Sequence, residues 1–126
     1  MTTAKCKVLI AEDNESIRCL MKILLEEKGC EVLEASNGKE AIELAPEHRP
    51  DLILMDLSMP VLDGFEAARR LRQIPATTRI PIVGVSSLCD GWHEQAIAAG
   101  CDECILKPID DKELGKILER FLHSEA

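Results

Sequence analysis

Residues 51–60 read DLILMDLSMP, and this stretch decides the fold. Its apolar run from Leu52 to Met55 shows neither a helical period nor strict alternation, which is typical of a strand buried on both faces of a parallel sheet. The run stops at Asp56. A carboxylate that ends such a strand lies in the crevice at the carboxyl edge of the sheet, where open α/β sheets bind ligands. We therefore expect the other strand ends to bring partner groups to Asp56.

The length and charge of the chain limit its class and its partners. With 126 residues it suits one domain over residues 1–126, and such a domain buries roughly two-thirds of its unfolded surface. It carries 15 Lys and Arg against 23 Asp and Glu, a formal net charge of −8. This charge disfavours nucleic acid and anionic lipid as partners. No apolar stretch approaches the roughly 18 residues of a spanning helix, so no membrane segment is expected.

Six cysteines are spread through apolar runs, and no signal peptide precedes them. Reduced thiols in a cytoplasmic protein are therefore expected. Cys101 and Cys104 form a CxxC, a spacing found in redox and metal-binding pairs. Thioredoxin-type pairs open a helix after a strand, whereas this pair enters a strand, so we favour two unrelated cysteines and keep a redox or metal pair as the alternative.

Four further segments have the composition of short strands, and they span residues 5–11, 31–35, 80–86 and 103–107. Helices are expected between the strands. One is predicted from about Trp92 to Ala99, and the others begin at four N-cap residues, Asn14, Asn37, Asp63 and Asp110. Gly29 is expected to end the first helix, and Pro46 to fray or end the second.

This alternation of strands and helices predicts an α/β domain, a doubly wound, flavodoxin-like parallel sheet of five strands with five helices on both faces. The common order of five such strands is 2-1-3-4-5. The first and third strands are then neighbours about 4.8 Å apart, so Glu12, Asp13 and Asp56 converge at one edge. Ser86 and Lys107 end the next two strands at the same edge.

Three carboxylates this close repel one another, and a hard divalent cation relieves the repulsion. Carboxylates, a backbone carbonyl and waters suit Mg²⁺ and leave positions open for phosphoryl oxygens. Asp56 can then attack phosphorus and become an aspartyl phosphate. Mg²⁺ and the Lys107 ammonium would neutralise charge on the phosphoryl group, and Ser86 can donate a hydrogen bond to it. Each group alone also suits a structural role, so the prediction rests on their joint placement.

Over essentially its whole length the chain resembles the receiver domains of two-component response regulators, which have the chemotaxis-regulator-like fold. The matching residues, in order and spacing, are Glu12-Asp13, Asp56, Met59-Pro60, Asp63-Gly64, Ser86, Ala99-Gly100, Asp102 and Lys107-Pro108. The resemblance implies a phosphorylation-controlled signalling switch rather than an enzyme with a separate substrate. Its phosphodonor would be a phosphohistidine on a sensor histidine kinase or a histidine phosphotransfer protein. A downstream effector protein would bind the face of the last two helices and the fifth strand.

The resemblance also implies a role for each residue of the site. Asp56 would accept the phosphoryl group and lose it slowly. Asp13, Asp56 and the backbone carbonyl of Ser58 would ligate Mg²⁺, with Glu12 acting through water. Lys107 would contact the phosphoryl group, and the Lys107–Pro108 bond would be cis and hold that lysine in place.

The chain departs from the family pattern near the site. Cys104 stands three residues before the lysine, where the family usually has Tyr or Phe, so we predict that the aromatic switch is absent or replaced. Ser58 and Leu88 lie where the family tunes water access to the phosphoryl group, and the apolar Leu88 predicts slow self-hydrolysis. Trp92 is either an edge residue of the core or an exposed partner contact.

Three other function classes fit the sequence less well. An enzyme of the haloacid-dehalogenase type needs a second acid two residues after its nucleophile, where this chain has Ser58. A flavodoxin-like cofactor binder or a nucleotide switch needs a Gly-rich phosphate loop, and neither GxGxxG nor GxxxxGK[ST] occurs. A phosphorylation-silent interaction module normally loses an acid or the lysine, and this chain has kept all of them.

Overall fold

The computed structural model describes residues 6–59, 62–86, 92–107 and 109–122, and of Trp92 it describes the backbone. The strands are β1 Lys7–Ala11, β2 Glu31–Ala35, β3 Leu52–Asp56, β4 Ile82–Ser86 and β5 Glu103–Leu106. The helices are α1 Glu15–Glu27, α2 Gly38–His48, α3 Gly64–Gln73, α4 Trp92–Ala99 and α5 Asp111–Leu122. Within these ranges no helix is long and apolar enough to cross a membrane.

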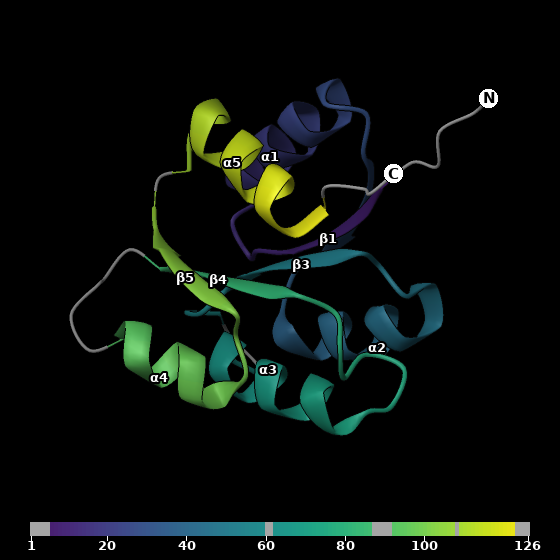
Figure 1. Ribbon diagram of the computed structural model, residues 1–126, viewed down its shortest axis with the longest axis vertical. Coiled ribbons are helices and arrows are strands. Elements are labelled where there is room, and N and C mark those ends of the chain that lie inside the picture. The colour runs from purple at the N-terminus through teal and green to yellow at the C-terminus, as the bar shows by residue number, and fades with distance from the viewer. Residues whose placement is uncertain (1–5, 60–61, 87–91, 108, 123–126) are drawn as a thin grey trace.

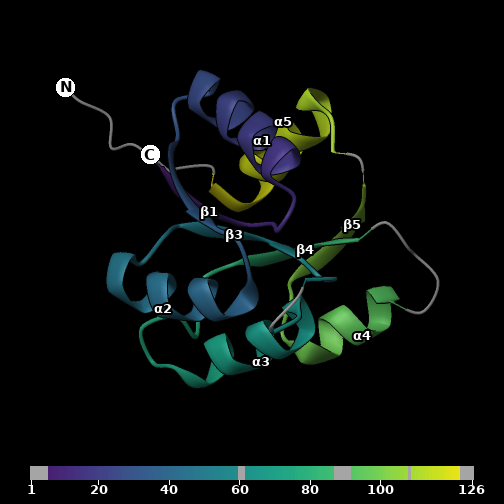
Figure 2. The ribbon, with the colours of Figure 1, turned by 180° about the vertical axis from the view of Figure 1, so that it is seen from behind.

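The strands form one parallel sheet in the order β2-β1-β3-β4-β5. Helices α1 and α5 cover one face, and α2, α3 and α4 cover the other (Figure 1). The view from behind shows the same three layers (Figure 2). The predicted fold class and strand order are therefore confirmed.

The central strand β3 is buried along its whole length, as its unbroken apolar run predicts. Its side chains alternate between two cores because successive residues of a strand point to opposite faces. Leu52 and Leu54 pack with α1 and α5, and Ile53 and Met55 pack with α2, α3 and α4. The carboxylate of Asp56 is thus carried by a strand that, like β4, is buried along its whole length.

The predicted helix caps are present. The side-chain oxygens of Asn14, Asn37 and Asp63 accept hydrogen bonds from the backbone N–H groups three residues later, at 2.8–3.0 Å. Asp110 does the same for Glu113 at 2.8 Å. Gly29 follows α1 with a φ of +91°, a conformation that favours glycine. These local signals fix where α1, α2, α3 and α5 begin.

Four boundary predictions differ from the structure. Strand β1 begins at Lys7, with Cys6 outside it, and β5 ends at Leu106 rather than at Lys107. The other two differences involve prolines. Pro46 lies inside α2, which continues to His48, because proline removes only its own hydrogen bond and the N–H of Arg49 still donates to the carbonyl of Ala45 at 2.8 Å. Strand β4 begins at Ile82 rather than at residue 80, since Pro81 has no N–H for the ladder. Only the difference at Lys107 concerns the carboxyl end of a strand, and the Lys107 N–H still donates to the Ser86 carbonyl oxygen of β4.

Gly64 brings the start of α3 against the end of β3. A Cβ atom at this position would lie 2.4 Å from the Asp56 carbonyl oxygen and 2.8 Å from the Leu57 Cα. Both are backbone atoms and cannot move aside as a side chain would. The absence of a side chain at Gly64 therefore permits the close approach of helix and strand.

We expect Gly64→Ala to lower the free energy of unfolding by about 1–3 kcal/mol, because the added methyl overpacks this contact. Urea unfolding measures the change. The matched control is Gly115→Ala in α5, where the added Cβ meets nothing nearer than 3.9 Å and helix propensity should raise stability by about 0.5–1 kcal/mol. Equal stability of the two variants would contradict this account of Gly64.

Candidate functional site

The residues predicted to form the site meet at the carboxyl edge of the sheet. Glu12 and Asp13 directly follow β1, Asp56 ends β3 and Ser86 ends β4. Lys107 follows β5, and its N–H donates to the Ser86 carbonyl oxygen at 2.7 Å. Because the strands are parallel and pair in register, all five residues lie at the carboxyl edge of the sheet.

Three carboxylates form the centre of this edge. One side-chain oxygen of each of Glu12, Asp13 and Asp56 lies within 4.8 Å of the other two. Glu12 and Asp56 are buried, and Asp13 is exposed to solvent. Hard oxygen donors grouped in this way are the ligands that Mg²⁺ prefers. Asp13 is therefore the member of the group that solvent reaches directly.

The Lys107 ammonium group balances part of this negative charge. Its Nζ lies 3.0 Å from Glu12 Oε1 and 3.2 Å from Asp56 Oδ2. Burial alone would lower the pKa of Lys107, but the hydrogen bonds and charges of Glu12 and Asp56 raise the pKa above its usual value. Lys107 is therefore a firmly charged group held between two acids.

The Asp56 carboxyl group is destabilised in its charged form. Burial and the nearby charge of Glu12 raise its pKa from 3.8 to about 6, and the Ser58 N–H and Lys107 oppose this rise. Its Oδ1 accepts a hydrogen bond from the Ser58 N–H at 3.1 Å, while its Oδ2 faces Lys107. At neutral pH Asp56 is ionised and poorly solvated. Its negative charge is therefore stabilised when the carboxylate acts as a nucleophile and forms a bond that spreads the charge over other atoms.

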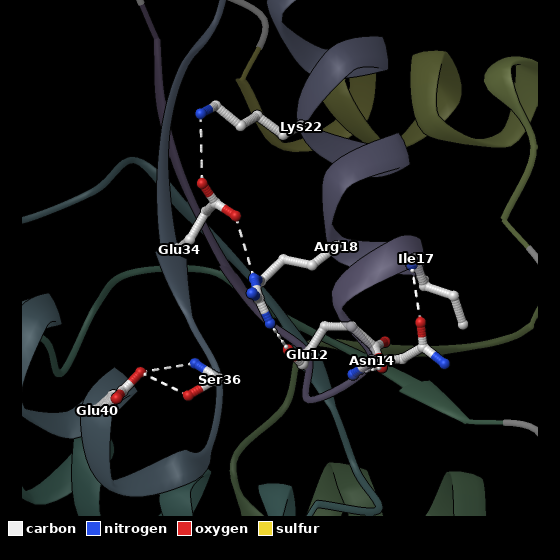
Figure 3. A network of polar contacts seen from close by, with 8 residues as sticks. All are labelled: Glu12, Asn14, Ile17, Arg18, Lys22, Glu34, Ser36 and Glu40. Carbon is white, nitrogen blue, oxygen red and sulfur yellow. Dashed lines mark hydrogen bonds and ion pairs between the residues drawn. The ribbon is translucent and has the colours of Figure 1, made fainter.

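Sequence reasoning missed Arg18, which fixes the turn that carries the acids (Figure 3). Its Nη1 donates to the Glu12 carbonyl oxygen at 2.8 Å, and its Nε pairs with Glu34 of β2 at 3.1 Å. Lys22, one helical turn further along α1, contacts the same Glu34 carboxylate at 3.3 Å. The sequence does contain a signal, because Arg18 and Lys22 are four residues apart in the first helix and Glu34 lies in the second strand. Only the pairing of β1 with β2 shows that these side chains meet.

The remaining predicted residues are Cys104, Trp92 and Leu88. Cys104, in β5, is half-buried and packs against the core under α2, α3 and α4. Burial raises the pKa of Cys104 and raises that of Cys101 to about 12, so both are protonated thiols at neutral pH. Trp92 begins α4. Leu88 and the Lys107–Pro108 bond fall outside the described residues, as does the Trp92 side chain.

The raised pKa of Asp56 predicts a pH-dependent cost in stability. Because the folded chain binds this proton more tightly than the unfolded chain, stability owed to Asp56 is lost as pH rises from about 4 to about 6. We expect Asp56→Asn to unfold like the parent at pH 4 and to be more stable by about 3 kcal/mol at pH 7 without divalent cations. Urea unfolding at both pH values measures the difference. If the two chains already differed in stability at pH 4 by as much as at pH 7, titration of Asp56 would not be the cause of the difference.

Arg18 should matter more for stability than its neighbour Lys22. We expect Arg18→Ala to lower the free energy of unfolding by about 1–3 kcal/mol, since it leaves the Glu12 carbonyl without this charged donor. Lys22→Ala removes only an exposed ion pair, which is worth about 0–1 kcal/mol. Chemical denaturation of the two variants side by side tests this, and equal small losses would make Arg18 a surface residue without a positioning role.

Comparison with known proteins agrees with this geometry. The family model for the response regulator receiver domain matches residues 8–119. The polar-differentiation response regulator DivK of Brucella anthropi is 37% identical over 116 residues, which cover 91% of this chain and 94% of that protein. A segment of hybrid signal transduction histidine kinase G of Dictyostelium discoideum is 38% identical over 124 residues, 95% of this chain but 4% of the kinase.

Solved structures give the same result. The receiver domain of a sensor histidine kinase from Pseudomonas aeruginosa, with a magnesium ion coordinated in its active site cleft, matches with a TM-score of 0.89 and 33% identity over 96% of this chain and 100% of that one. The chemotaxis protein CheY4 of Vibrio cholerae matches with a TM-score of 0.88 and 33% identity over 94% of this chain and 100% of that one. This chain therefore belongs to the response regulator receiver domain family of two-component signalling.

Proposed function

We propose that this chain accepts a phosphoryl group on Asp56 from a phosphohistidine, in a Mg²⁺-dependent reaction, and thereby switches its binding to an effector protein. The observation that carries the proposal is the buried Asp56 carboxylate, within 3.2 Å of the Lys107 ammonium and grouped with Glu12 and Asp13. The donor would be a sensor histidine kinase or a histidine phosphotransfer protein. The family match over residues 8–119 supports a single receiver domain, and the use of a kinase that consumes ATP supports a cytoplasmic location.

The donor set fits Mg²⁺ rather than a soft metal. All three side chains offer carboxylate oxygens, and no thiol or imidazole belongs to this group among the described residues. Asp13 and Asp56 would hold the ion together with the Ser58 carbonyl oxygen, and Glu12 would act through water. When bound, the ion neutralises charge on phosphoryl oxygens and orients them.

The chain's own residues divide the transfer step between them. A side-chain oxygen of Asp56 attacks phosphorus, the P–O bond forms as the P–N bond breaks, and the electron pair of that bond stays on the imidazole nitrogen. The Asp56 charge is thereby spread over the phosphoryl oxygens, so Lys107 can leave the carboxylate and pair with one of them. The Ser86 hydroxyl, at the end of the adjacent strand β4, would donate a hydrogen bond to another.

Exposed apolar side chains of α1 support a protein as the phosphodonor. Ile17 and Leu20 line an apolar pocket of about 130 Å³ together with the Lys107 stem, so this surface is continuous with the site. Leu20 and Ile23 are about half exposed, at 55% and 47%. A donor that covers α1 would bury these side chains and exclude water from Asp56 during transfer.

The effector surface is proposed on α4, β5 and α5. Ile97 of α4 and Leu106 of β5 are exposed large apolar residues at 42% and 49%, which suits a protein contact. Cys104 takes the usual aromatic position and its small side chain packs inward, which supports a switch without an aromatic rotamer. Phosphorylation would then reach this surface through the ends of β4 and β5.

Intact mass measured after incubation with Mg²⁺ and acetyl phosphate tests the proposed function. We expect one phosphoryl group that is labile to base, and none on Asp56→Asn or without Mg²⁺. Lys107→Ala should bind Mg²⁺ but gain phosphoryl at least about tenfold more slowly, because the charge developing on the phosphoryl oxygens loses its ammonium partner.

Calorimetric titration with Mg²⁺ distinguishes the ways in which this experiment can fail. A parent chain that binds Mg²⁺ but stays unmodified would overturn the phosphoacceptor proposal and leave a constitutive interaction module. A phosphoryl group that persists in Asp56→Asn would place the modification on another residue. Arg49→Ala, a change on the exposed amino side of the sheet, serves as the control that should be modified like the parent.

A further inference from the structure

Two cysteines lie side by side at the amino edge of the sheet, opposite the proposed phosphorylation site. Cys6 immediately precedes β1 and Cys30 immediately precedes β2. Their Sγ atoms are 2.9 Å apart, and both are reduced. Among the described cysteines, no other two thiols lie within hydrogen-bond distance. This contact is separate from the Cys101 and Cys104 pair that the sequence spacing singles out.

The backbone holds the two thiols together. The N–H of Glu31 donates to the Cys6 carbonyl oxygen at 2.8 Å, which continues the β1–β2 ladder by one residue. The N–H of Cys30 donates to the Leu25 carbonyl oxygen at 3.0 Å, so the end of α1 fixes the other side. Both side chains face the core beneath α1 and α5. Residues on adjacent strands have the Cα separation that a disulfide spans, about 4.4–6.8 Å.

We propose that Cys6 and Cys30 are a site of reversible oxidation, at which a low-molecular-weight disulfide of the glutathione class converts the two thiols into an intramolecular disulfide. The Cys6 thiolate first attacks one sulfur of the small disulfide and releases one small thiolate. Cys30 then loses its proton and attacks Cys6 Sγ, which releases the second. One protein S–S bond replaces two S–H bonds, and the two electrons and two protons leave on two small thiols.

Accessibility assigns the order of these two attacks. Cys6 is half-buried and open to a small reagent, whereas Cys30 is 4% exposed. Burial and the neighbouring Cys6 raise the pKa of Cys30 to about 12, so its thiolate is scarce at neutral pH. The second attack is therefore the slow one, and its rate should rise about tenfold for each pH unit in the neutral range.

A disulfide between Cys6 and Cys30 would raise the stability of the fold and would not move the carboxylates of Glu12, Asp13 and Asp56. It would close a loop between positions 24 residues apart in sequence, which contains the whole of α1. Such a crosslink restricts the unfolded chain, and a rise in Tm on the order of 10 °C is expected for a domain of this size. Asp56 lies at the other edge of the sheet, so the oxidised chain should still bind Mg²⁺.

The test is to incubate the full chain with oxidised glutathione, block the remaining thiols, and map disulfide-linked peptides by mass spectrometry. We expect a chain lighter by two hydrogens, with a peptide containing Cys6 joined to one containing Cys30, and a Tm that returns to its starting value with dithiothreitol. Cys30→Ala should lose both the linked peptide and the rise in Tm. Cys101→Ala is the matched control, since Cys101 is equally buried at 4% exposed and should retain both.

Several results would overturn the proposal. They are a linked peptide that joins Cys101 and Cys104, stable glutathione adducts without an intramolecular bond, or a Tm rise that survives in Cys30→Ala. If Cys30→Ala fails to fold, Cys6→Ser gives the same test at the half-buried position, where a hydroxyl is tolerated more easily. None of these outcomes depends on phosphorylation of Asp56, so this proposal and the proposed function fail separately.

Discussion

Two buried carboxylates, those of Glu12 and Asp56, both pair with one ammonium group, Lys107 Nζ. This excess of negative over positive charge determines the electrostatics of the carboxyl edge of the sheet. Parallel pairing of β1 with β3 forces the acids together, and the core on both faces of β3 prevents them from turning away. With Asp13 added, three negative charges face one positive charge. The fold therefore holds an electrostatic repulsion that a divalent cation, a proton or a charge-spreading reaction at Asp56 relieves.

The two edges of the sheet are built differently. At the carboxyl edge, charged groups meet and the strand ends are tied to helix starts, as where Gly64 of α3 touches the end of β3. At the amino edge, Cys6 and Cys30 join apolar neighbours, and Lys7 donates from its side chain to the His48 carbonyl oxygen at 3.2 Å. The group of three carboxylates lies at the carboxyl edge, and a crosslink between Cys6 and Cys30 at the amino edge would not touch it.

Sequence reasoning succeeds here where a signal is local or follows from strand order. The unbroken apolar run of β3 and the cap residues needed no tertiary information, and the order of five parallel strands brought Asp56 to Glu12 and Lys107. It failed at Pro46, where the expected helix break did not occur because the rest of the last turn remained bonded. It also missed the Arg18 contact and the Cys6–Cys30 pair, since both depend on which residues of β1 and β2 lie opposite one another.

Cys104 bears on how the proposed phosphorylation site and the proposed effector surface would communicate. An aromatic side chain at this position would change rotamer as one large rigid group. The Cys104 thiol is small and packs inward, so a change in its rotamer would displace few neighbouring atoms. The β4–β5 ladder offers a second route, because Gly84 pairs with Cys104 and Ser86 pairs with Leu106, which is exposed at 49%. The Lys107 N–H is bonded to the Ser86 carbonyl oxygen, so under the proposed function a shift of Ser86 toward a phosphoryl group would pull on the backbone that carries Leu106. In this chain we expect the signal to pass along backbone hydrogen bonds rather than through an aromatic rotamer.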